Sequence, residues 1–421
     1  MPTAADWRDM KRAPTKDLVA GITVAIVALP LALAFGIASG LGAEAGITTA
    51  IIAGALAAIF GGSRLQVSGP TGAMTVVLVP IVHQFGASAV LLVGLMAGII
   101  LIIAAYAKIG EHVHRLPTSL IEGFTAGIAV VITLQQFPFI FGVEASHSEK
   151  VWAGAFDVLV RGVAQVNLES ISIALGVCLV ILLGTKKWPK MPFALITVFA
   201  SAAVASMLGM EIETIGELPA RIGDFNLEFL NGSNLVALVP SAFAVAALAA
   251  LESLLSAKVA DKMRGGEERH DSNKELFGQG IANLVVPFFG GVPATAALAR
   301  TAVNVRSHAQ SKLAALSHSL VLAAVVLLFA PLVSQIPLAA LAGVLLATTA
   351  RMIKPRELMS LARESKLDAL VLICTFVATI AIDLISAVII GLVLSLALRK
   401  TSLAAIDRRY PPVDEKETLG D

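Results

Sequence analysis

Long blocks of apolar residues dominate the chain and constrain its fold more than any other feature. They include Leu18–Ile37, Ala89–Tyr106, Ile171–Leu183 and Ala369–Ile382. A helix needs about 20 apolar residues to cross a bilayer, and several blocks reach or approach that length. Only 14% of the residues are charged, whereas a typical soluble protein has roughly 25%. The sequence therefore predicts an all-α, polytopic membrane protein.

We expect fourteen membrane segments, preceded by a polar cytoplasmic leader at 1–16 and followed by a short cytoplasmic tail at 401–421. The third and tenth segments, 71–84 and 295–306, are too short to cross a bilayer and are expected to be half-helices. The other segments are 17–39, 45–60, 87–108, 118–142, 169–184, 192–208, 235–262, 274–288, 310–331, 336–352, 367–382 and 385–399.

Basic residues alternate regularly with these segments. They occupy the N-terminal stretch and follow the even-numbered segments, whereas the odd-numbered ends are mostly neutral or acidic. Because basic loops stay in the cytoplasm, we expect both termini on the cytoplasmic side of the inner (plasma) membrane. The basic residues that follow even-numbered segments are Arg64, Lys108, Arg115, Lys186, Lys187, Lys190, Lys258, Lys262, Arg264, Arg306, Lys312, Arg351, Lys354, Arg356, Arg399 and Lys400.

Two short patterns recur in the two halves of the chain, in the same order. FGG occurs at 60–62 and at 289–291, and LPTSLIEG at 116–123 resembles IPLAALAG at 336–343, with offsets of 220 to 229 residues. Seven segments per half is an odd number, so the second half is expected to insert upside down. Inverted repeats with interrupted helices are typical of secondary transporters.

Each half also contains a break in the apolar pattern. SGPTG at 68–72 and GVPATA at 291–296 consist largely of turn and cap residues, and each precedes a half-helix. Irregular backbone is tolerated at membrane depth only inside protein or beside a watery cavity. In an inverted repeat the two helix N-termini point at each other, and their unpaired N–H groups attract an anion. The alternative is a pair of proline kinks that ease helix packing.

Glu252 is the most informative single residue, because a carboxylate inside an apolar segment is costly and usually functional. We expect it to carry a proton or to bind a sodium ion. Ser256 lies one turn further on the same helix face and could share either role. The alternative is a structural carboxylate that Arg300 or backbone N–H groups hold in place.

Four residues near the breaks have more than one interpretation. Arg300 binds the anion directly, neutralises Glu252, or anchors its half-helix towards the cytoplasm. Thr71 and Thr295 either cap the half-helices or donate to the substrate. Phe35 either packs in the core or forms a wall of the substrate cavity.

The remaining composition argues against several function classes. The net charge is +1, so nothing favours nucleic-acid binding. The seven histidines lie near segment ends without metal-ligand spacing, and we interpret them as loop residues. Cys178 and Cys374 are interpreted as inert buried thiols. The sequence contains no HExxH, GxSxG or phosphate-binding loop, so we expect neither an enzyme nor a cofactor.

Five stretches together resemble the sulfate permease family, also called solute carrier family 26. They are ALPLALAFGIASGLGAEAGI, GGSRLQVSGPTGAMT, SNKELFGQGIANLVVPFFGG, PATAALARTAVNV and IDLISAVIIGLVLSLA. The resemblance covers essentially the whole membrane portion and implies a seven-plus-seven inverted repeat. It also implies a core domain (17–115 and 235–331) and a gate domain (116–234 and 332–400), with the substrate between the two half-helices.

The resemblance implies roles for individual residues. The aromatic residue of segment one that lines the family's site corresponds to Phe35, and the acid of segment eight corresponds to Glu252. The Arg of the family's SRSAVN pattern corresponds to Arg300 in ARTAVN. The residues expected to contact the substrate are Phe35, Thr71, Gly72, Ala73, Thr295, Ala296, Ala297 and Arg300.

The sequence also departs from the family pattern. Sodium-coupled bicarbonate relatives carry Asp in place of Glu252 and lack Arg300, and family serines near the tenth half-helix are Ala297 and Ala299 here. Family members normally end in a cytoplasmic STAS domain, whereas only the short tail at 401–421 is expected here.

We therefore expect a secondary active transporter of small anions, with proton-coupled symport of a dicarboxylate, bicarbonate or sulfate by alternating access. The alternatives are a sodium-coupled bicarbonate symporter and an anion exchanger or channel. The expected partners are the anion, a proton or sodium ion, and the lipid bilayer. A second copy of the chain, in a homodimer, is a further candidate partner.

Overall fold

The computed structural model describes residues 8–111, 117–146, 148, 150–189, 191–231, 235–265, 269–384, 386–395 and 397. Residues 1–7 of the expected leader and the expected tail at 401–421 therefore lie outside the described residues. The chain divides into two compact units, Met1–Arg115 with Ala129–Arg351, and Leu116–Ile128 with Met352–Asp421. The core and gate domains stay a prediction.

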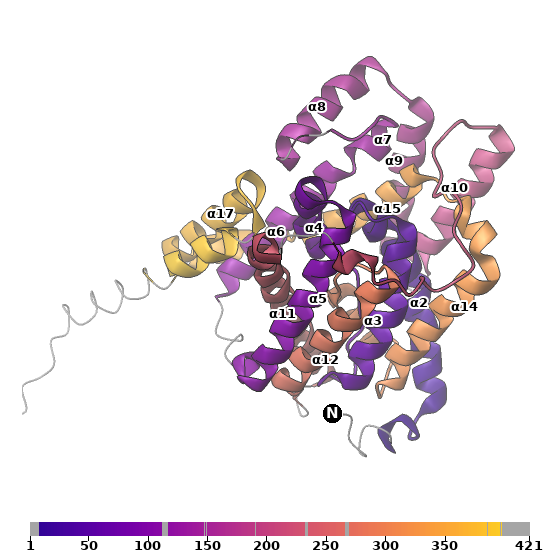
Figure 1. Cartoon of the computed structure of the whole chain (residues 1–421). Coiled ribbons are helices and arrows are strands. Elements are labelled where there is room, and N and C mark those ends of the chain that lie inside the picture. Colours follow the sequence, from indigo (N-terminus) through magenta and orange to yellow (C-terminus); the bar gives the residue numbers. More distant parts are fainter. Residues whose placement is uncertain are drawn as a thin grey trace, which may run out of the picture. The chain divides into compact units, whose positions relative to one another are not determined.

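The first unit is built from helices, of which α2, α3, α5, α12 and α14 pack side by side (Figure 1). Its helices are α2 (Pro14–Ala38), α3 (Ala43–Phe60), α4 (Gly72–Phe85), α5 (Ala87–Tyr106), α7 (Phe137–Phe141), α8 (Val151–Ala164), α9 (Leu168–Lys187), α10 (Phe193–Leu208), α11 (Leu235–Arg264), α12 (Ser272–Val285), α13 (Leu298–Arg306), α14 (Leu313–Ser334) and nearly all of α15 (Leu338–Met352). Short polar side chains begin several of them, as Asp271 does by accepting the N–H groups of Asn273 and Lys274 at the start of α12.

The second unit contains α16 (Pro355–Glu364) and α17 (Lys366–Ala381), together with the first part of α6 (Thr118–Gln135). Ser365 caps α17, and its hydroxyl accepts the N–H groups of Leu367 and Asp368. The last predicted segment, 385–399, is described in part, as the helix Ser386–Ser395.

Eight helices among the described residues are long and apolar enough to cross a membrane. They are Pro14–Ala38, Ala43–Phe60, Ala87–Tyr106, Thr118–Phe141, Leu168–Lys187, Leu235–Arg264, Leu313–Ser334 and Leu338–Arg363. The predicted half-helices are indeed short, because α4 has 14 residues and α13 has 9. At about 1.5 Å per residue, neither reaches across a hydrocarbon layer of about 30 Å. The count of fourteen segments stays a prediction.

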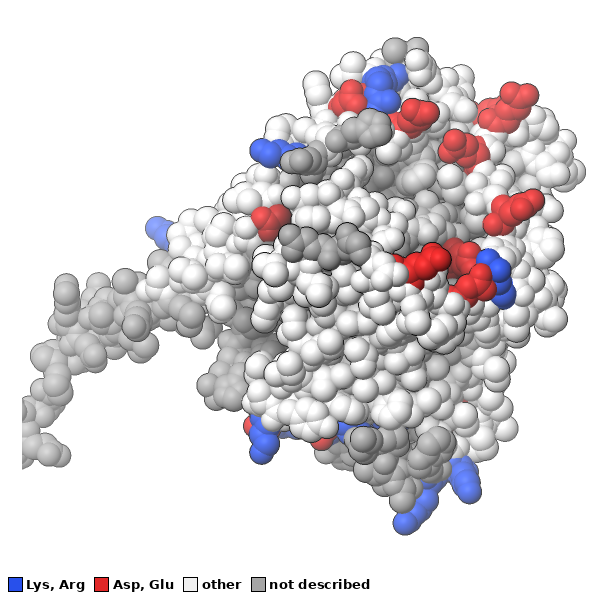
Figure 2. All heavy atoms as spheres, viewed as in Figure 1, with Lys and Arg blue, Asp and Glu red and all other residues white. Residues whose placement is uncertain are grey.

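The surface of the first unit reflects its apolar sequence. Figure 2 shows a broad region without charged side chains over α12 and α3, with charged side chains above and below it. Large apolar side chains are widely exposed there and elsewhere, for example Leu328 at 71% and Leu320 at 70%. Apolar surface of this extent is unfavourable in water and fits a bilayer.

Two short helices and the exposure of both cysteines differ from the sequence-based expectations. The helices α8 and α16 lie where no segment was expected. Short amphipathic helices do not raise the average hydropathy of their surroundings, so the apolar blocks of the sequence did not indicate them. The interpretation of both cysteines as buried is also wrong, since Cys178 and Cys374 are free thiols of intermediate exposure.

The fold is also not purely helical. Ser68–Gly69 (β1) pairs antiparallel with Thr295–Ala296 (β2), so the prediction of an all-α protein is wrong in this detail. The physical reason is that both segments are buried, and buried N–H and C=O groups need partners. The strands β1 and β2 supply these hydrogen-bond partners to each other.

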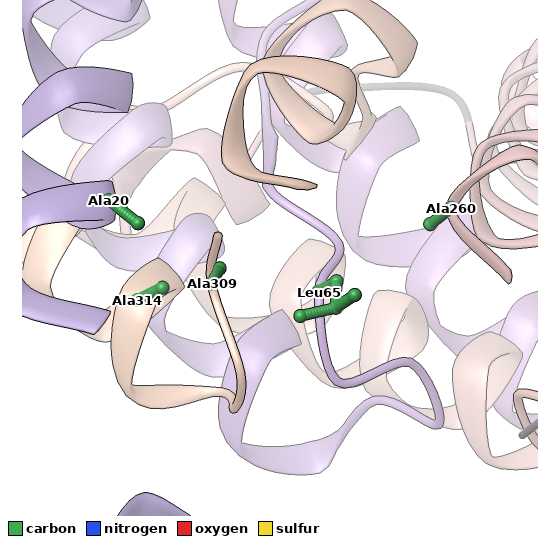
Figure 3. Packing of buried hydrophobic residues seen from close by; sticks show 5 residues of the cluster. All are labelled: Ala20, Leu65, Ala260, Ala309 and Ala314. Atoms are coloured by element: carbon green, nitrogen blue, oxygen red, sulfur yellow. The ribbon is translucent and has the colours of Figure 1, made fainter. Parts of the chain in front are cut away.

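The extended segment before α4 runs through the interior of the first unit. Leu65, on this segment, belongs to a buried cluster with Ala20 of α2, Ala260 of α11, Ala309 between α13 and α14, and Ala314 at the start of α14 (Figure 3). Small alanine side chains let these helices approach the extended backbone closely. The packing therefore fixes the segment that leads into the first half-helix.

Candidate functional site

The β1–β2 pair brings the two breaks of the sequence together. Ser68 lies opposite Ala296, and Gly69 lies opposite Thr295. Each strand leads within a few residues into a short helix, β1 into α4 and β2 into α13. Because the strands are antiparallel, the two helices leave the pair in opposite directions with their N-termini towards it. Two helix N-termini at one place create a region of positive potential.

Thr71 links the start of α4 to Glu252. It is the N-cap residue, and its Oγ1 accepts the N–H of Met74 at 3.3 Å. The same hydroxyl donates to Oε2 of Glu252 on α11 at 2.8 Å. The structure confirms that Thr71 caps the helix, and its donation to a substrate stays a prediction.

Glu252 retains partial exposure, although it lies within a long apolar helix. It interacts electrostatically with Arg300, but no direct ion pair joins these two described side chains. The donor that contacts the carboxylate is the hydroxyl of Thr71 on the neighbouring half-helix. The coupling role of Glu252 and its structural role both stay predictions.

Arg300 is almost completely buried, at 1% exposure, and crosses from α13 to the other break. Its Nη2 donates to the carbonyl oxygen of Pro70 at 2.5 Å. Its Nη1 has no hydrogen-bond partner among the described residues. Arg300 and Glu252 therefore contact adjacent residues, Pro70 and Thr71, and Nη1 of Arg300 is buried beside Gly69.

Gly69 makes this position of Arg300 possible. Its φ is +151°, a conformation that residues with a side chain rarely adopt. A methyl group on Gly69 would also lie 2.5 Å from Nη1 of Arg300. The absence of a side chain at Gly69 thus leaves room for the guanidinium against the strand.

The second half-helix begins later than predicted. Thr295 was expected to start it, but Thr295 and Ala296 lie in β2, and the first helical residue is Leu298. Thr295 is fully buried, and its Oγ1 donates to the carbonyl oxygen of Ala249 at 3.2 Å. The pairing with β1 keeps these residues extended, so Thr295 is not the N-cap of α13. The N-cap residue is Ala297, which has no side-chain donor or acceptor.

Ser253, which sequence reasoning missed, holds β2 against α11. Its Oγ accepts the N–H of Ala296 at 3.2 Å and lies 3.0 Å from Oγ1 of Thr295. The signal in the sequence was a serine directly after Glu252, in addition to Ser256, in a largely apolar stretch of the helix.

Ser256, which was expected to share the role of Glu252, makes a different contact. It is fully buried, and its Oγ donates to Oγ1 of Thr301 at 3.0 Å. Thr301 in turn accepts the N–H of Val67 at 3.1 Å. The hydroxyl of Ser256 therefore joins α11 to α13 and is not shown to contact Glu252.

The other predicted contact residues surround the start of α4 and α13. Phe35 and Gly72 touch, since a methyl group on Gly72 would lie 3.1 Å from Cε1 of Phe35. Ala73 is buried beside Gly72, at 2% exposure, whereas Ala297 is partly exposed. The structure thus gathers the predicted residues around one strand pair. Their contact with a substrate stays a prediction.

Three polar side chains of α12 hold the two extended segments, and sequence reasoning also missed these roles. Because they are four residues apart, they share one helix face, which is a signal that the sequence contains. Glu275 Oε2 accepts the N–H groups of Gly62 and Ser63 at 3.0 Å each. Gln279 donates to Ser68 Oγ at 2.7 Å. Asn283 accepts the N–H of Ala294 at 2.7 Å and donates to the carbonyl oxygen of the same residue at 2.9 Å.

His318 corrects the interpretation of all histidines as loop residues. It lies inside α14 with 0% exposure, and neither ring nitrogen has a hydrogen-bond partner among the described residues. Within the described ranges, no group of three His, Cys, Asp or Glu residues is placed to hold a metal ion.

Comparison with known proteins identifies relatives of the chain. The model of the sulfate permease family matches residues 15–375. The chain is 39% identical to the putative sulfate transporter YvdB of Bacillus subtilis over 90% of this chain and 72% of that protein. It is 33% identical to the bicarbonate transporter BicA of Picosynechococcus over 89% of this chain and 68% of that protein.

Solved structures show the same fold. The transmembrane domain of a cyanobacterial bicarbonate transporter BicA superposes with a TM-score of 0.81 at 32% identity, over 90% of this chain and 98% of that one. The murine solute carrier 26 family member A9, in its inward-facing state, gives 0.83 at 18% identity over 93% of this chain and 69% of that one, and this likeness concerns the fold alone. These matches show that the chain belongs to the sulfate permease family of anion transporters.

Proposed function

We propose that the protein is a secondary active transporter that couples symport of a dicarboxylate, bicarbonate or sulfate to protons. The observation that carries this proposal is the hydrogen bond from Thr71 to Glu252 at the N-terminus of α4. It joins a titratable carboxylate to a helix end that attracts anions. Proton and anion would therefore bind at neighbouring positions.

Electrostatics gives a reason for coupling. When Glu252 is ionised, its negative charge offsets part of the positive potential from Arg300 and the two helix N-termini. A proton on Glu252 removes that charge, so an anion binds more strongly. By linkage, each ligand strengthens the binding of the other by the same factor. Proton and anion are then carried together.

The movement that we propose is alternating access between the core domain (17–115 and 235–331) and the gate domain (116–234 and 332–400), in a seven-plus-seven inverted repeat of elevator type.

We place both termini in the cytoplasm and the protein in the plasma membrane, because the basic residues follow even-numbered segments. A homodimer is the assembly that we propose to test first. In this scheme Phe35, Gly72, Ala73, Ala296 and Ala297 line the anion site, and Thr295 supports it.

A second candidate is a sodium-coupled bicarbonate symporter. The likeness to two bicarbonate transporters named BicA, at 33% identity each, favours bicarbonate as its anion. In that case the oxygen atoms of Glu252 and Thr71 would bind the ion, since sodium prefers oxygen ligands. Exchange or channel activity is the third outcome that an experiment must separate.

Uptake into proteoliposomes tests these proposals. The purified chain is offered bicarbonate, sulfate and a dicarboxylate such as succinate, each under a proton gradient, a sodium gradient or neither. Concentrative uptake that needs only the proton gradient supports proton symport. Uptake that needs sodium supports the second candidate. Flux that only dissipates an anion gradient identifies a channel, and flux that requires an internal anion identifies an exchanger.

A further inference from the structure

The two amphipathic helices α8 and α16 both expose large apolar side chains. Phe156 of α8 is 67% exposed, and Met359 of α16 is 60% exposed. A helix that combines exposed apolar side chains with charged ones fits the boundary between water and hydrocarbon. The two helices differ, however, in whether their charged side chains already have partners.

The charges of α8 are neutralised within the helix. Its charged residues are Asp157 and Arg161, and their side chains pair at 2.8 Å. The same helix exposes Trp152 and Val163. It therefore offers an apolar surface without an unpaired charge, and it serves as the comparison for α16.

The arginines of α16 are unpaired. Arg356 and Arg363 are exposed, and neither forms an ion pair or a hydrogen bond with the groups that the structure describes. Glu357, which lies beside Arg356 in the sequence, pairs with Lys354 at 2.9 Å instead. The stretch 354–366 contains four basic and two acidic residues. Its positive charge is therefore not balanced locally.

The two arginines share one helix face with Met359. The three residues occupy positions i, i+3 and i+7, which lie above one another on a helix. Leu358 and Leu361 are half-buried, and α16 packs against α17. At about 1.5 Å per residue, Arg356 and Arg363 are roughly 10 Å apart along the helix. Two phosphate groups can therefore lie side by side along this face.

An anionic phospholipid matches both the charge and the apolar part of this face. A guanidinium group binds a phosphate through two parallel hydrogen bonds. Free phosphate or sulfate would leave Met359 in water, whereas a phospholipid offers an anionic headgroup next to apolar chains. Because basic residues follow the even-numbered segments, we expect α16 at the cytoplasmic leaflet, whose surface potential is negative.

We propose that the face of α16 formed by Arg356, Met359 and Arg363 is a binding site for anionic phospholipids. Each guanidinium group binds the phosphate of one headgroup, and Met359 lies between them against the acyl chains. The bound lipids hold the second unit, to which α16 belongs, at the membrane surface. This inference does not depend on which anion is transported or on its coupling ion.

The test titrates the full chain in detergent with phosphatidylglycerol, and the rise of the thermal midpoint reports binding. Arg356→Gln and Arg363→Gln are combined in one variant. A basic residue at an anionic surface strengthens binding about fivefold, so this variant should need about 25 times more lipid for half of the rise. The control combines Lys150→Gln and Arg161→Gln, which removes the same charge at α8, and its lipid requirement should change less than twofold. Equal requirements in all three proteins would overturn the proposal.

Two further ligands separate the lipid from its parts. Inorganic phosphate should affect the wild type and the Arg356→Gln, Arg363→Gln variant equally, and so should phosphatidylcholine, which has no net charge. If inorganic phosphate distinguishes the two proteins as strongly as phosphatidylglycerol does, the site binds a free anion and the proposal is wrong. Arg356→Lys with Arg363→Lys keeps both charges, so its lipid requirement should lie between those of the wild type and the glutamine variant.

A fluorescent label locates the bound lipid. Met359→Cys is introduced after Cys178→Ser and Cys374→Ser, and an environment-sensitive fluorophore is attached in nanodiscs of phosphatidylcholine with or without phosphatidylglycerol. We expect phosphatidylglycerol to shift the emission to shorter wavelength, and Arg356→Gln with Arg363→Gln to abolish the shift. The same label at Phe156→Cys on α8 should not respond to phosphatidylglycerol. A response at Phe156→Cys equal to that at Met359→Cys would contradict a site on α16.

Discussion

Thr71 donates its single hydroxyl hydrogen to Oε2 of Glu252 at 2.8 Å, while the same oxygen accepts the N–H of Met74 at 3.3 Å. A hydroxyl has one hydrogen to give, so an anion that takes the Thr71 hydrogen must release Glu252. An anion bound at the start of α4, as we propose, would therefore act on Glu252 through one hydrogen bond. This relationship leads to the first two predictions.

Replacing Glu252 with Gln should abolish concentrative uptake under a proton gradient. The amide oxygen still accepts the hydroxyl of Thr71, but the side chain no longer titrates. Exchange of labelled for unlabelled anion should persist, since it needs no coupling proton. The control is Glu228→Gln in the exposed 3-10 helix Glu228–Leu230. Accumulation by Glu252→Gln equal to wild type would show that another group carries the proton.

Replacing Thr71 with Val should weaken both the fold and the site. Loss of an N-cap typically costs about 0.5–2 kcal/mol of stability, and the partner of Glu252 is lost as well. We expect a lower thermal midpoint and an anion affinity reduced about tenfold. Thr71→Ser keeps the hydroxyl and should restore both. If Thr71→Ser behaves like Thr71→Val, the hydroxyl is not the cause.

Arg300→Ala should lower anion affinity by a factor of ten or more, because a charge-assisted hydrogen bond contributes roughly 1.5–3 kcal/mol. Arg300→Lys keeps the charge but loses the planar group that reaches Pro70. Its anion affinity should therefore lie between those of the wild type and Arg300→Ala. Isothermal titration of the purified proteins measures this. Equal affinities in all three would reduce Arg300 to a structural anchor.

Gly69→Ala should reproduce much of the Arg300→Ala phenotype without changing any charge. The added methyl group would lie 2.5 Å from Nη1, and φ of +151° is strained for alanine. The matched control is Gly176→Ala, since an alanine side chain there meets no atom within 4 Å. We expect affinity to fall for Gly69→Ala only. The same titration tests this, and wild-type affinity would contradict the close packing.

The orientation is tested with single cysteines at Thr3 and Gly420, after replacement of Cys178 and Cys374 by Ser. Because basic residues follow the even-numbered segments, both cysteines should resist an impermeant thiol reagent in intact cells and react after the membrane is opened. Labelling of either position from outside would contradict the predicted topology.

Local sequence was sufficient for the features that depend on local chemistry. The break at Pro70–Thr71, the capping role of Thr71 and the short lengths of α4 and α13 follow from turn residues, cap residues and apolar run lengths. The sequence also identified Glu252 through the cost of a charge in an apolar helix. The structure places it beside Thr71.

Features that depend on partners distant in the chain could not be predicted from local sequence. Thr295 stays extended because β1, more than two hundred residues earlier, pairs with it. Ser256 and Ser253 lie three residues apart on α11, and only their partners, Thr301 and Ala296, separate their roles. His318 was misread for a similar reason, since the helices that bury it are distant in the sequence.

The antiparallel register of Ser68 with Ala296 and of Gly69 with Thr295 has a mechanical consequence. It ties the segments that lead into α4 and α13 to each other through backbone hydrogen bonds, which do not depend on which side chains are present. In the transport cycle that we propose, the two helix ends keep their spacing and move as a single rigid piece. The gap through which an anion escapes would then open at the borders of this piece.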